Sequence, residues 1–119
     1  MKKIFILEDE IIISNLYKKR LTSEWFLVET SINIENSKKI ILENNPDIAL
    51  LDHWLKEDDE FWLHLIKFIK KESPKTKIIM LSNYSHDELL CKAKREWAYD
   101  FLIKLEYTPK KLAEYLKKL

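Results

Sequence analysis

The chain has 119 residues with 21 basic and 20 acidic side chains, so its net charge is only +1. This balance gives no electrostatic reason to expect nucleic acid or an anionic membrane as a direct partner. The single cysteine, Cys91, excludes an internal disulfide, and no apolar run reaches the ~20 residues of a membrane span. We therefore expect a cytoplasmic protein in which residues 1–119 form a single domain.

The predicted elements of the N-terminal half alternate between strand and helix. They are a strand over Ile4–Leu7, a helix over Ile11–Leu21, a short strand over Trp25–Val28, a helix over Ile34–Leu42 and a strand over Asp47–Leu51. The apolar stripe of the first helix consists of Ile12, Ile13, Leu16, Tyr17 and Leu21. Pro46 follows the second helix and explains why it ends. The chain has no glycine, so Asn, Asp or other residues must occupy left-handed backbone positions at some conformational cost.

The same alternation continues to the C-terminus. The predicted elements are a helix over Phe61–Ile69, a strand over Ile78–Leu81, a helix from a Ser85/Glu88 capping box to about Glu96, a strand over Tyr99–Ile103 and a final helix. Thr108 and Pro109 supply the N-cap and first turn of that last helix, whose apolar side carries Leu112, Tyr115, Leu116 and Leu119. Strict alternation predicts an α/β fold, a doubly wound sheet of five parallel strands with five helices. Spacing alone does not give the strand order, but the flavodoxin-like order 2-1-3-4-5 is compatible with it.

Five polar residues stand at or just past the ends of the apolar strands. They are Glu8, Asp9, Asp52, Ser82 and Lys104. Taken singly, each is a commonplace helix cap or solvated side chain. All parallel strands end at the same edge of a sheet, however, and ligands of open α/β sheets bind outside that edge. The sequence therefore predicts that these five residues form one site.

The chemistry of this set favours a metal ion and a phosphoryl group. Three converging carboxylates repel one another, which raises at least one pKa unless a cation lies among them. Oxygen ligands without a cluster of His or Cys favour Mg²⁺, which leaves coordination positions for a phosphoryl oxygen. Asp52 is then the candidate nucleophile for covalent phosphoryl transfer, while Lys104 and Ser82 contact phosphoryl oxygens.

Four segments carry a resemblance to a known family along essentially the whole chain. They are Ile4-Phe5-Ile6-Leu7-Glu8-Asp9-Glu10, Pro46-Asp47-Ile48-Ala49-Leu50-Leu51-Asp52, Ile78-Ile79-Met80-Leu81-Ser82 and Ala98-Tyr99-Asp100-Phe101-Leu102-Ile103-Lys104. The sequence resembles the receiver domain of two-component response regulators, whose fold and strand order match those expected above. The resemblance implies an acidic Mg²⁺-binding pair at Glu8 and Asp9, a phosphoacceptor at Asp52, a switch hydroxyl at Ser82 and a phosphate-binding Lys104. It further implies that Phe101 is the switch aromatic and that the backbone carbonyl of Trp54 is a metal ligand.

The chain departs from the family pattern at several positions. Lys56 and Glu60 stand where the family usually has proline and glycine, and Trp97-Ala98 stands where Gly-Ala is usual. Lys104-Leu105 replaces the usual Lys-Pro, so we expect a trans bond in a rebuilt loop or else a strained cis bond. By the same resemblance, the aromatic residues Trp54 and Tyr84 border the site. They either restrict the attacking water or pack on an apolar surface.

The resemblance implies a phosphoacceptor switch rather than an enzyme. A sensor histidine kinase or phosphotransfer protein would phosphorylate Asp52, and the surface formed by about residues 86–118 would pass the change to a downstream effector or to an output domain outside these residues. A homodimer is possible. The alternative is a receiver-like binding module that does not depend on phosphorylation, which the altered loops suggest. An aspartyl phosphatase is remote, because Trp54 stands where such enzymes carry a second aspartate.

Overall fold

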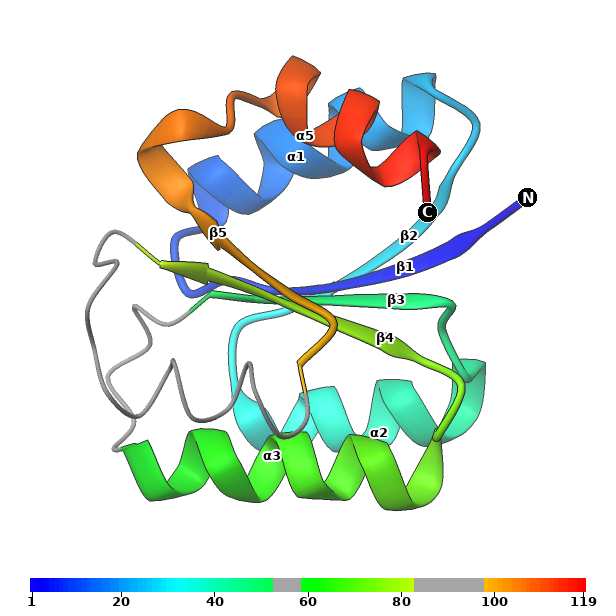
Figure 1. Ribbon diagram of the computed structural model, residues 1–119, viewed down its shortest axis with the longest axis vertical. Coiled ribbons are helices and arrows are strands. Elements are labelled where there is room, and N and C mark those ends of the chain that lie inside the picture. Colours follow the sequence, from blue (N-terminus) through cyan, green and yellow to red (C-terminus); the bar gives the residue numbers. More distant parts are fainter. Residues whose placement is uncertain (53–58, 83–97) are drawn as a thin grey trace.

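The protein is a doubly wound α/β domain built on one parallel sheet, as the sequence predicts (Figure 1). A computed structural model describes residues 1–52, 59–82 and 98–119. The strands are β1 (Lys3–Leu7), β2 (Leu27–Ser31), β3 (Ile48–Asp52), β4 (Lys77–Ser82) and β5 (Asp100–Ile103). They pair in the order β2-β1-β3-β4-β5, and every pairing is parallel.

Helices cover both faces of the sheet. The described helices are α1 (Ile11–Ser23), α2 (Ile34–Asn44), α3 (Asp59–Glu72), α5 (Pro109–Lys117) and a short 3-10 helix, η1 (Lys104–Glu106). Figure 1 shows α1 and α5 on one face and α2 and α3 on the other. The helix predicted from Ser85 to Glu96 lies outside the described residues. Within the described ranges, no helix has the length and apolar character needed to span a membrane.

The three central strands are apolar on both faces because each face meets a layer of helices. In β1, Phe5 and Leu7 face α2 and α3, whereas Ile4 and Ile6 face α1 and α5. All five residues of β3 are buried. Burial on both faces explains why these strands read as unbroken apolar runs in the sequence.

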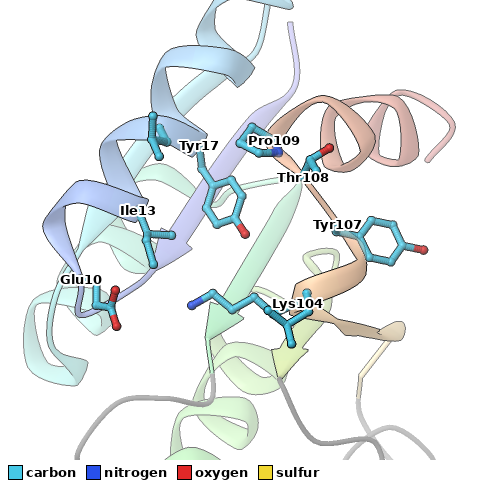
Figure 2. Close-up of a pocket in the computed structure, with 9 residues that line it drawn as sticks. Glu10, Ile13, Tyr17, Lys104, Tyr107, Thr108 and Pro109 are labelled. Carbon is cyan, nitrogen blue, oxygen red and sulfur yellow. The ribbon is translucent and has the colours of Figure 1, made fainter.

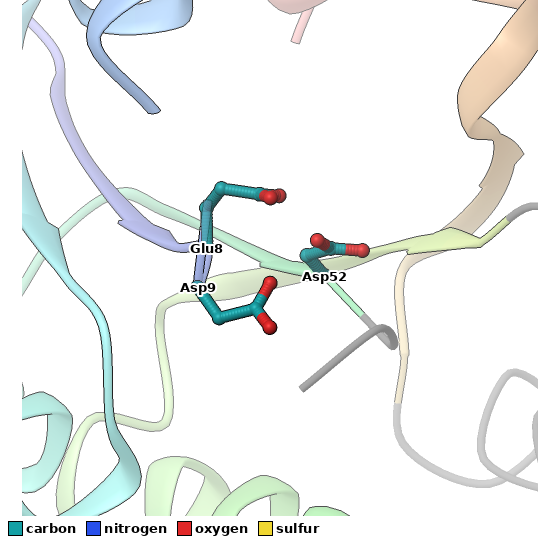
Figure 3. A group of neighbouring side chains, drawn as sticks. All are labelled: Glu8, Asp9 and Asp52. Carbon is teal, nitrogen blue, oxygen red and sulfur yellow. The ribbon is translucent and has the colours of Figure 1, made fainter. Parts of the chain in front are cut away.

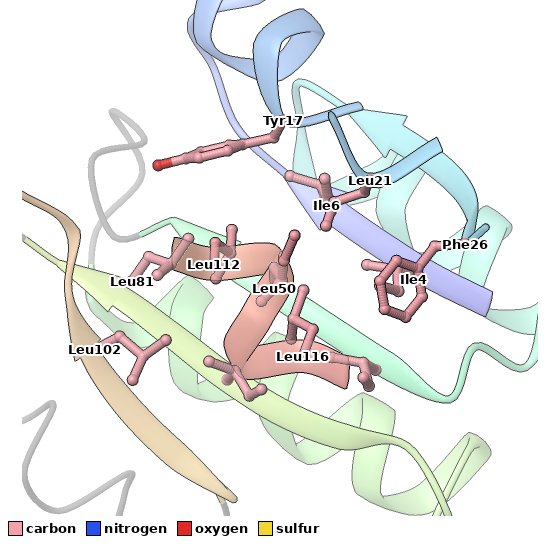
Figure 4. Packing of buried hydrophobic residues seen from close by; sticks show 13 residues of the cluster. Ile4, Ile6, Tyr17, Leu21, Phe26, Leu50, Leu81, Leu102, Leu112 and Leu116 are labelled. Atoms are coloured by element: carbon pink, nitrogen blue, oxygen red, sulfur yellow. The ribbon is translucent and has the colours of Figure 1, made fainter. Parts of the chain in front are cut away.

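Helix α5 is held to the sheet by one apolar side. Leu112, Ala113 and Leu116 are buried, and Figure 4 shows Leu112 and Leu116 beside Leu50 and Leu81 of the sheet. The Thr108 side chain accepts a hydrogen bond from the Lys111 N–H at 3.2 Å, which confirms the predicted N-cap. The start of α5 is therefore fixed immediately after the segment that contains η1.

Two details of the N-terminal half differ from the sequence prediction. The second strand is Leu27–Ser31 rather than Trp25–Val28, because Trp25 adopts a φ of 72° in the turn after α1 and is 79% exposed. The predicted apolar stripe of α1 is also too wide. Tyr17 and Leu21 are buried, but Ile12 and Leu16 are exposed to solvent. Trp25 and Asn45, at φ 44°, fill left-handed positions, as expected for a chain without glycine.

Candidate functional site

The sheet brings the predicted site residues to its carboxyl edge. Glu8 and Asp9 follow β1, while Asp52 and Ser82 are the last residues of β3 and β4. Leu7 lies opposite Leu51 in the register, so the ends of β1 and β3 are level. Figure 3 shows the side chains of Glu8, Asp9 and Asp52 converging on one space, and a carboxylate oxygen from each lies within 4.8 Å of the others.

Lys104 reaches this acidic cluster from β5, the strand at one edge of the sheet. It follows β5, and its Nζ donates to Glu8 Oε2 at 2.9 Å and to Asp52 Oδ2 at 2.8 Å. The side chains of both acids are 1% exposed and that of Lys104 is 10% exposed. Removing charges from water is costly unless they are paired, so one ammonium group compensates two buried carboxyl groups here.

The pKa values of the cluster follow from this arrangement. Burial, and next the interaction with Asp52, raise the pKa of Glu8 to about 8, although Lys104 opposes the shift. Burial alone would lower the pKa of Lys104, but its hydrogen bonds with Asp52 and Glu8 outweigh burial and raise the pKa. Lys104 therefore stays charged, whereas Glu8 exchanges its proton near neutral pH. The sequence expectation that crowding raises one carboxyl pKa agrees with this result, with burial as the main cause.

The donor set fits a small divalent cation. Asp9 Oδ1 is buried and has no hydrogen-bond partner among the described residues. A buried carboxylate oxygen without a partner is unfavourable unless a cation binds it. Three carboxylates at this spacing offer the oxygen ligands that Mg²⁺ prefers. The residues present therefore suit the metal that the sequence predicts.

Ser82 ends β4 and Phe101 lies in β5, the two strands that follow β3 in the sheet. Ser82 is fully buried and lies opposite Ile103 in the register, directly before Lys104. Phe101 is half-buried and packs against the apolar cluster under α2 and α3. Both residues thus belong to the strands β4 and β5 that border the site. Trp54 and Tyr84, the predicted carbonyl ligand and bordering aromatics, lie outside the described residues.

Sequence reasoning missed a pocket beside the cluster. A cavity of about 540 Å³ lies between α1 and the β5–α5 connection, lined in part by Ile13, Tyr17, Lys104 and Tyr107. Figure 2 shows the Tyr17 ring extending from α1 toward the Lys104 side chain. Burial is the main cause that raises the pKa of Tyr17. The sequence signal for this pocket is the tyrosine within the apolar stripe of α1, because a buried phenol usually has its hydroxyl near a polar group.

The peptide bond after Lys104 is trans, since no cis peptide bond occurs in the described ranges. Residues Lys104–Glu106 form η1. Of the two alternatives that the sequence predicts, the segment therefore adopts the trans bond in a rebuilt loop. The substitution of leucine for the family's usual proline does not displace Lys104 from the carboxylates. Leu105 itself is 82% exposed.

Comparisons with known proteins agree with this geometry. A family described as the response regulator receiver domain matches residues 4–117. The nitrogen assimilation regulatory protein NtrX of Azorhizobium caulinodans is 31% identical over 101 residues, which cover 85% of this chain and 22% of that protein. A putative NtrX-like response regulator of Rickettsia typhi is 32% identical, with 85% and 21% covered. The chain thus spans about a fifth of the length of these curated relatives.

Solved structures show the same fold. A CheY-like receiver domain protein from Methanospirillum hungatei superposes with a TM-score of 0.85 at 25% identity, covering 99% of this chain and 92% of that one. A response regulator from Thermotoga maritima gives 0.84 at 24% identity, covering 99% and 96%. NtrX from Brucella abortus gives 0.81 at 26% identity, covering 98% of this chain and 25% of that one.

Proposed function

The chain belongs to the response regulator receiver domain family of two-component systems, and on that premise we propose that Asp52 is its phosphoacceptor. The observation that carries the proposal is the bridge that Lys104 makes between Glu8 and Asp52, beside an Asp9 oxygen that has no hydrogen-bond partner among the described residues. This arrangement supports a site that holds a carboxylate nucleophile next to fixed positive charge, as phosphoryl transfer requires.

In the proposed reaction an Asp52 carboxylate oxygen attacks the phosphorus of a phosphohistidine on a sensor kinase or phosphotransfer protein. The new O–P bond forms as the N–P bond breaks, and the leaving imidazole nitrogen keeps the electron pair and takes a proton from solvent. Lys104 turns from the carboxylates to the phosphoryl oxygens and neutralises their charge, and the Ser82 hydroxyl donates to one of them. The product is an acyl phosphate on Asp52.

Glu8, Asp9 and Asp52 would hold Mg²⁺ in this state, together with the predicted Trp54 carbonyl. The ion supplies positive charge against the phosphoryl oxygens and the crowded carboxylates. The protein keeps those carboxylates in place and away from bulk water, and it supplies the positive charge of Lys104 beside them. The buried Asp9 Oδ1, which accepts no hydrogen bond from the part of the chain that the structure describes, supports this assignment.

The phosphodonor protein must approach the carboxyl edge of the sheet. Two exposed apolar side chains line the pocket next to Lys104 and form an apolar rim there, Leu16 of α1 and Leu105 of η1. We propose that this apolar rim receives the donor, because apolar surface gathered beside a reactive site is typical of a protein contact.

We further propose that residues 1–119 act as one receiver domain. Its phosphorylation is then read by a downstream protein or an output domain, through Ser82, Phe101 and the surface after β4.

The proposal is tested by intact-mass measurement after incubation with Mg²⁺ and acetyl phosphate. We expect one added phosphoryl group on the parent protein and none on Asp52→Ala. Asp47→Ala is the matched control, because Asp47 precedes the same strand at the opposite edge of the sheet and should leave the adduct intact. An adduct that persists in Asp52→Ala would contradict the assignment. No adduct on the parent protein would favour a binding module that acts without phosphorylation.

A further inference from the structure

The segment that carries Lys104 has little support of its own. η1 spans three residues, Lys104–Glu106, and no side-chain hydrogen bond caps its start. The Tyr107 N–H donates to the Lys104 carbonyl at 3.2 Å and closes the end of the turn. Leu105 is 82% exposed, and Glu106 is exposed as well. A turn this short needs an external anchor if Lys104 is to stay on two buried carboxylates.

Tyr115 of α5 contacts the residue on the far side of this turn. The rings of Tyr107 and Tyr115 meet edge to face, with centroids 5.9 Å apart and an interplanar angle of 72°. This geometry is the favourable one for an aromatic pair. The residue that closes η1 is therefore packed against the last helix.

The same Tyr115 also binds the strand that leads into the turn. Its hydroxyl donates to Asp100 Oδ2, at the first residue of β5. The other oxygen of that carboxylate, Oδ1, accepts the Phe101 backbone N–H at 2.7 Å. One tyrosine is thus fastened to the beginning of β5 by its hydroxyl and to the end of η1 by its ring.

We infer that Tyr115 is a positioning residue for Lys104, acting through Asp100 on one side of the β5–η1 segment and through Tyr107 on the other. The inference rests on the proposed role of Lys104 at the phosphorylation site. Tyr115 itself stands on a rigid support, since its neighbours Leu112 and Leu116 are completely buried. Burial and the bond to Asp100 raise the pKa of Tyr115, so the phenol keeps the proton that it donates.

The test measures the position of Lys104 directly. Each lysine is labelled by brief exposure to acetic anhydride in EDTA, and the extent of labelling is read by peptide mass spectrometry. In the parent protein we expect Lys104 to be protected, because its Nζ is bonded to Glu8 and Asp52. Tyr115→Phe removes the hydroxyl and keeps the ring, and it should raise labelling of Lys104 several-fold. Labelling of Lys111, an exposed lysine of α5, should not change.

Two further variants separate the anchor from general packing. Tyr107→Phe keeps the ring contact and should leave Lys104 protected, whereas Tyr107→Leu should expose it. Unchanged labelling of Lys104 in both Tyr115→Phe and Tyr107→Leu would overturn the inference. So would a rise of all lysines together, because that result would assign Tyr115 to the general packing of α5.

The labelling experiment does not require phosphorylation, so it stands whether or not Asp52 accepts a phosphoryl group. If Asp52 is phosphorylated, Tyr115→Phe should also slow the acetyl phosphate reaction several-fold without moving the adduct from Asp52. A parent protein with a protected Lys104 and no adduct would contradict the proposed function and leave the anchor intact. An adduct together with an unprotected Lys104 in the parent protein would support the proposed function and contradict the anchor.

Discussion

The Lys104 Nζ lies 2.8 Å from the Asp52 Oδ2, although the two residues are 52 positions apart in the sequence. Neither residue could occupy its place alone, because an unpaired buried charge is strongly unfavourable. The parallel register of β3, β4 and β5 brings the two together. Glu8 shares the same ammonium group, so the three side chains form one electrostatic unit.

The raised pKa of Glu8 predicts that stability falls as pH rises. Its pKa is about 8 in the folded protein and 4.5 as the ordinary value, so the folded state binds more protons than the unfolded state between these two values. The free energy of unfolding in EDTA should therefore decrease from about pH 4.5 to about pH 8, by at most a few kcal/mol from this group. Urea unfolding across this range measures the effect.

Glu8→Gln is the control for that prediction, because it removes the titrating proton and keeps the size of the side chain. Its stability should vary less with pH than that of the parent protein. Equal pH dependence in the two proteins would show that Glu8 is not the group responsible.

Asp9→Asn should weaken Mg²⁺ binding without unfolding the protein. The Asp9 Oδ1 has no partner among the described residues, so its loss costs no described hydrogen bond, and the change in stability in EDTA should stay within about 0.5 kcal/mol. The loss of a charged oxygen ligand should lower the Mg²⁺ affinity at least about tenfold, as measured by titration calorimetry. Glu10→Gln, at an exposed neighbour, should bind Mg²⁺ like the parent protein. If Asp9→Asn binds Mg²⁺ as tightly as the parent protein and Glu10→Gln do, Asp9 is not a metal ligand.

Leu50→Ala should destabilise the fold by about 2–5 kcal/mol in chemical denaturation. Leu50 is completely buried in the middle of β3, among side chains of α1 and α5, as Figure 4 shows. Leu105→Ala removes the same atoms from a side chain that is 82% exposed, and it should change stability by no more than about 0.5 kcal/mol. A similar loss in the two variants would argue against this placement of the core.

Trp25→Gly should stabilise the protein by about 0.5–1 kcal/mol, because Trp25 has a φ of 72° and little of its side chain is buried. Thermal unfolding compares this variant with Trp25→Ala. The alanine keeps a Cβ and should show no such gain. A gain in Trp25→Ala as large as that in Trp25→Gly would trace the effect to the ring rather than to the backbone.

The sequence predicted the central strands well because both of their faces are buried. β1, β3 and β4 appear as unbroken apolar runs, and the residues after them define the site. β2 was placed two residues too early, since it is an edge strand with alternating exposure and the apolar Trp25 precedes it in a turn. Apolar character also misled the prediction for α1, where Ile12 is exposed to solvent and Leu16 lines the pocket instead of the core.

The hydrogen bonds and pKa shifts of the site could not be predicted without interatomic distances. Sequence order predicted that Glu8, Asp52 and Lys104 would meet, but it could not say that one ammonium group bonds both acids or which carboxyl pKa would rise. The link from Tyr115 to Asp100 and Tyr107 was equally invisible, because it joins side chains whose helix and strand give no sign of the contact in their periodicity.

The place of Lys104 along the chain also bears on how the protein folds during synthesis. Glu8, Asp9 and Asp52 leave the ribosome well before residue 104, and β1 and β3 are able to pair once both have emerged. Until β5 is added, the nascent sheet therefore gathers three carboxylates with no lysine beside them. Docking of the last strand is the step that brings the internal counter-charge, and before that step a cation from the surrounding solution, such as Mg²⁺, would have to offset the three carboxylates. The rate at which the early sheet forms should accordingly rise with Mg²⁺, while the final step should not.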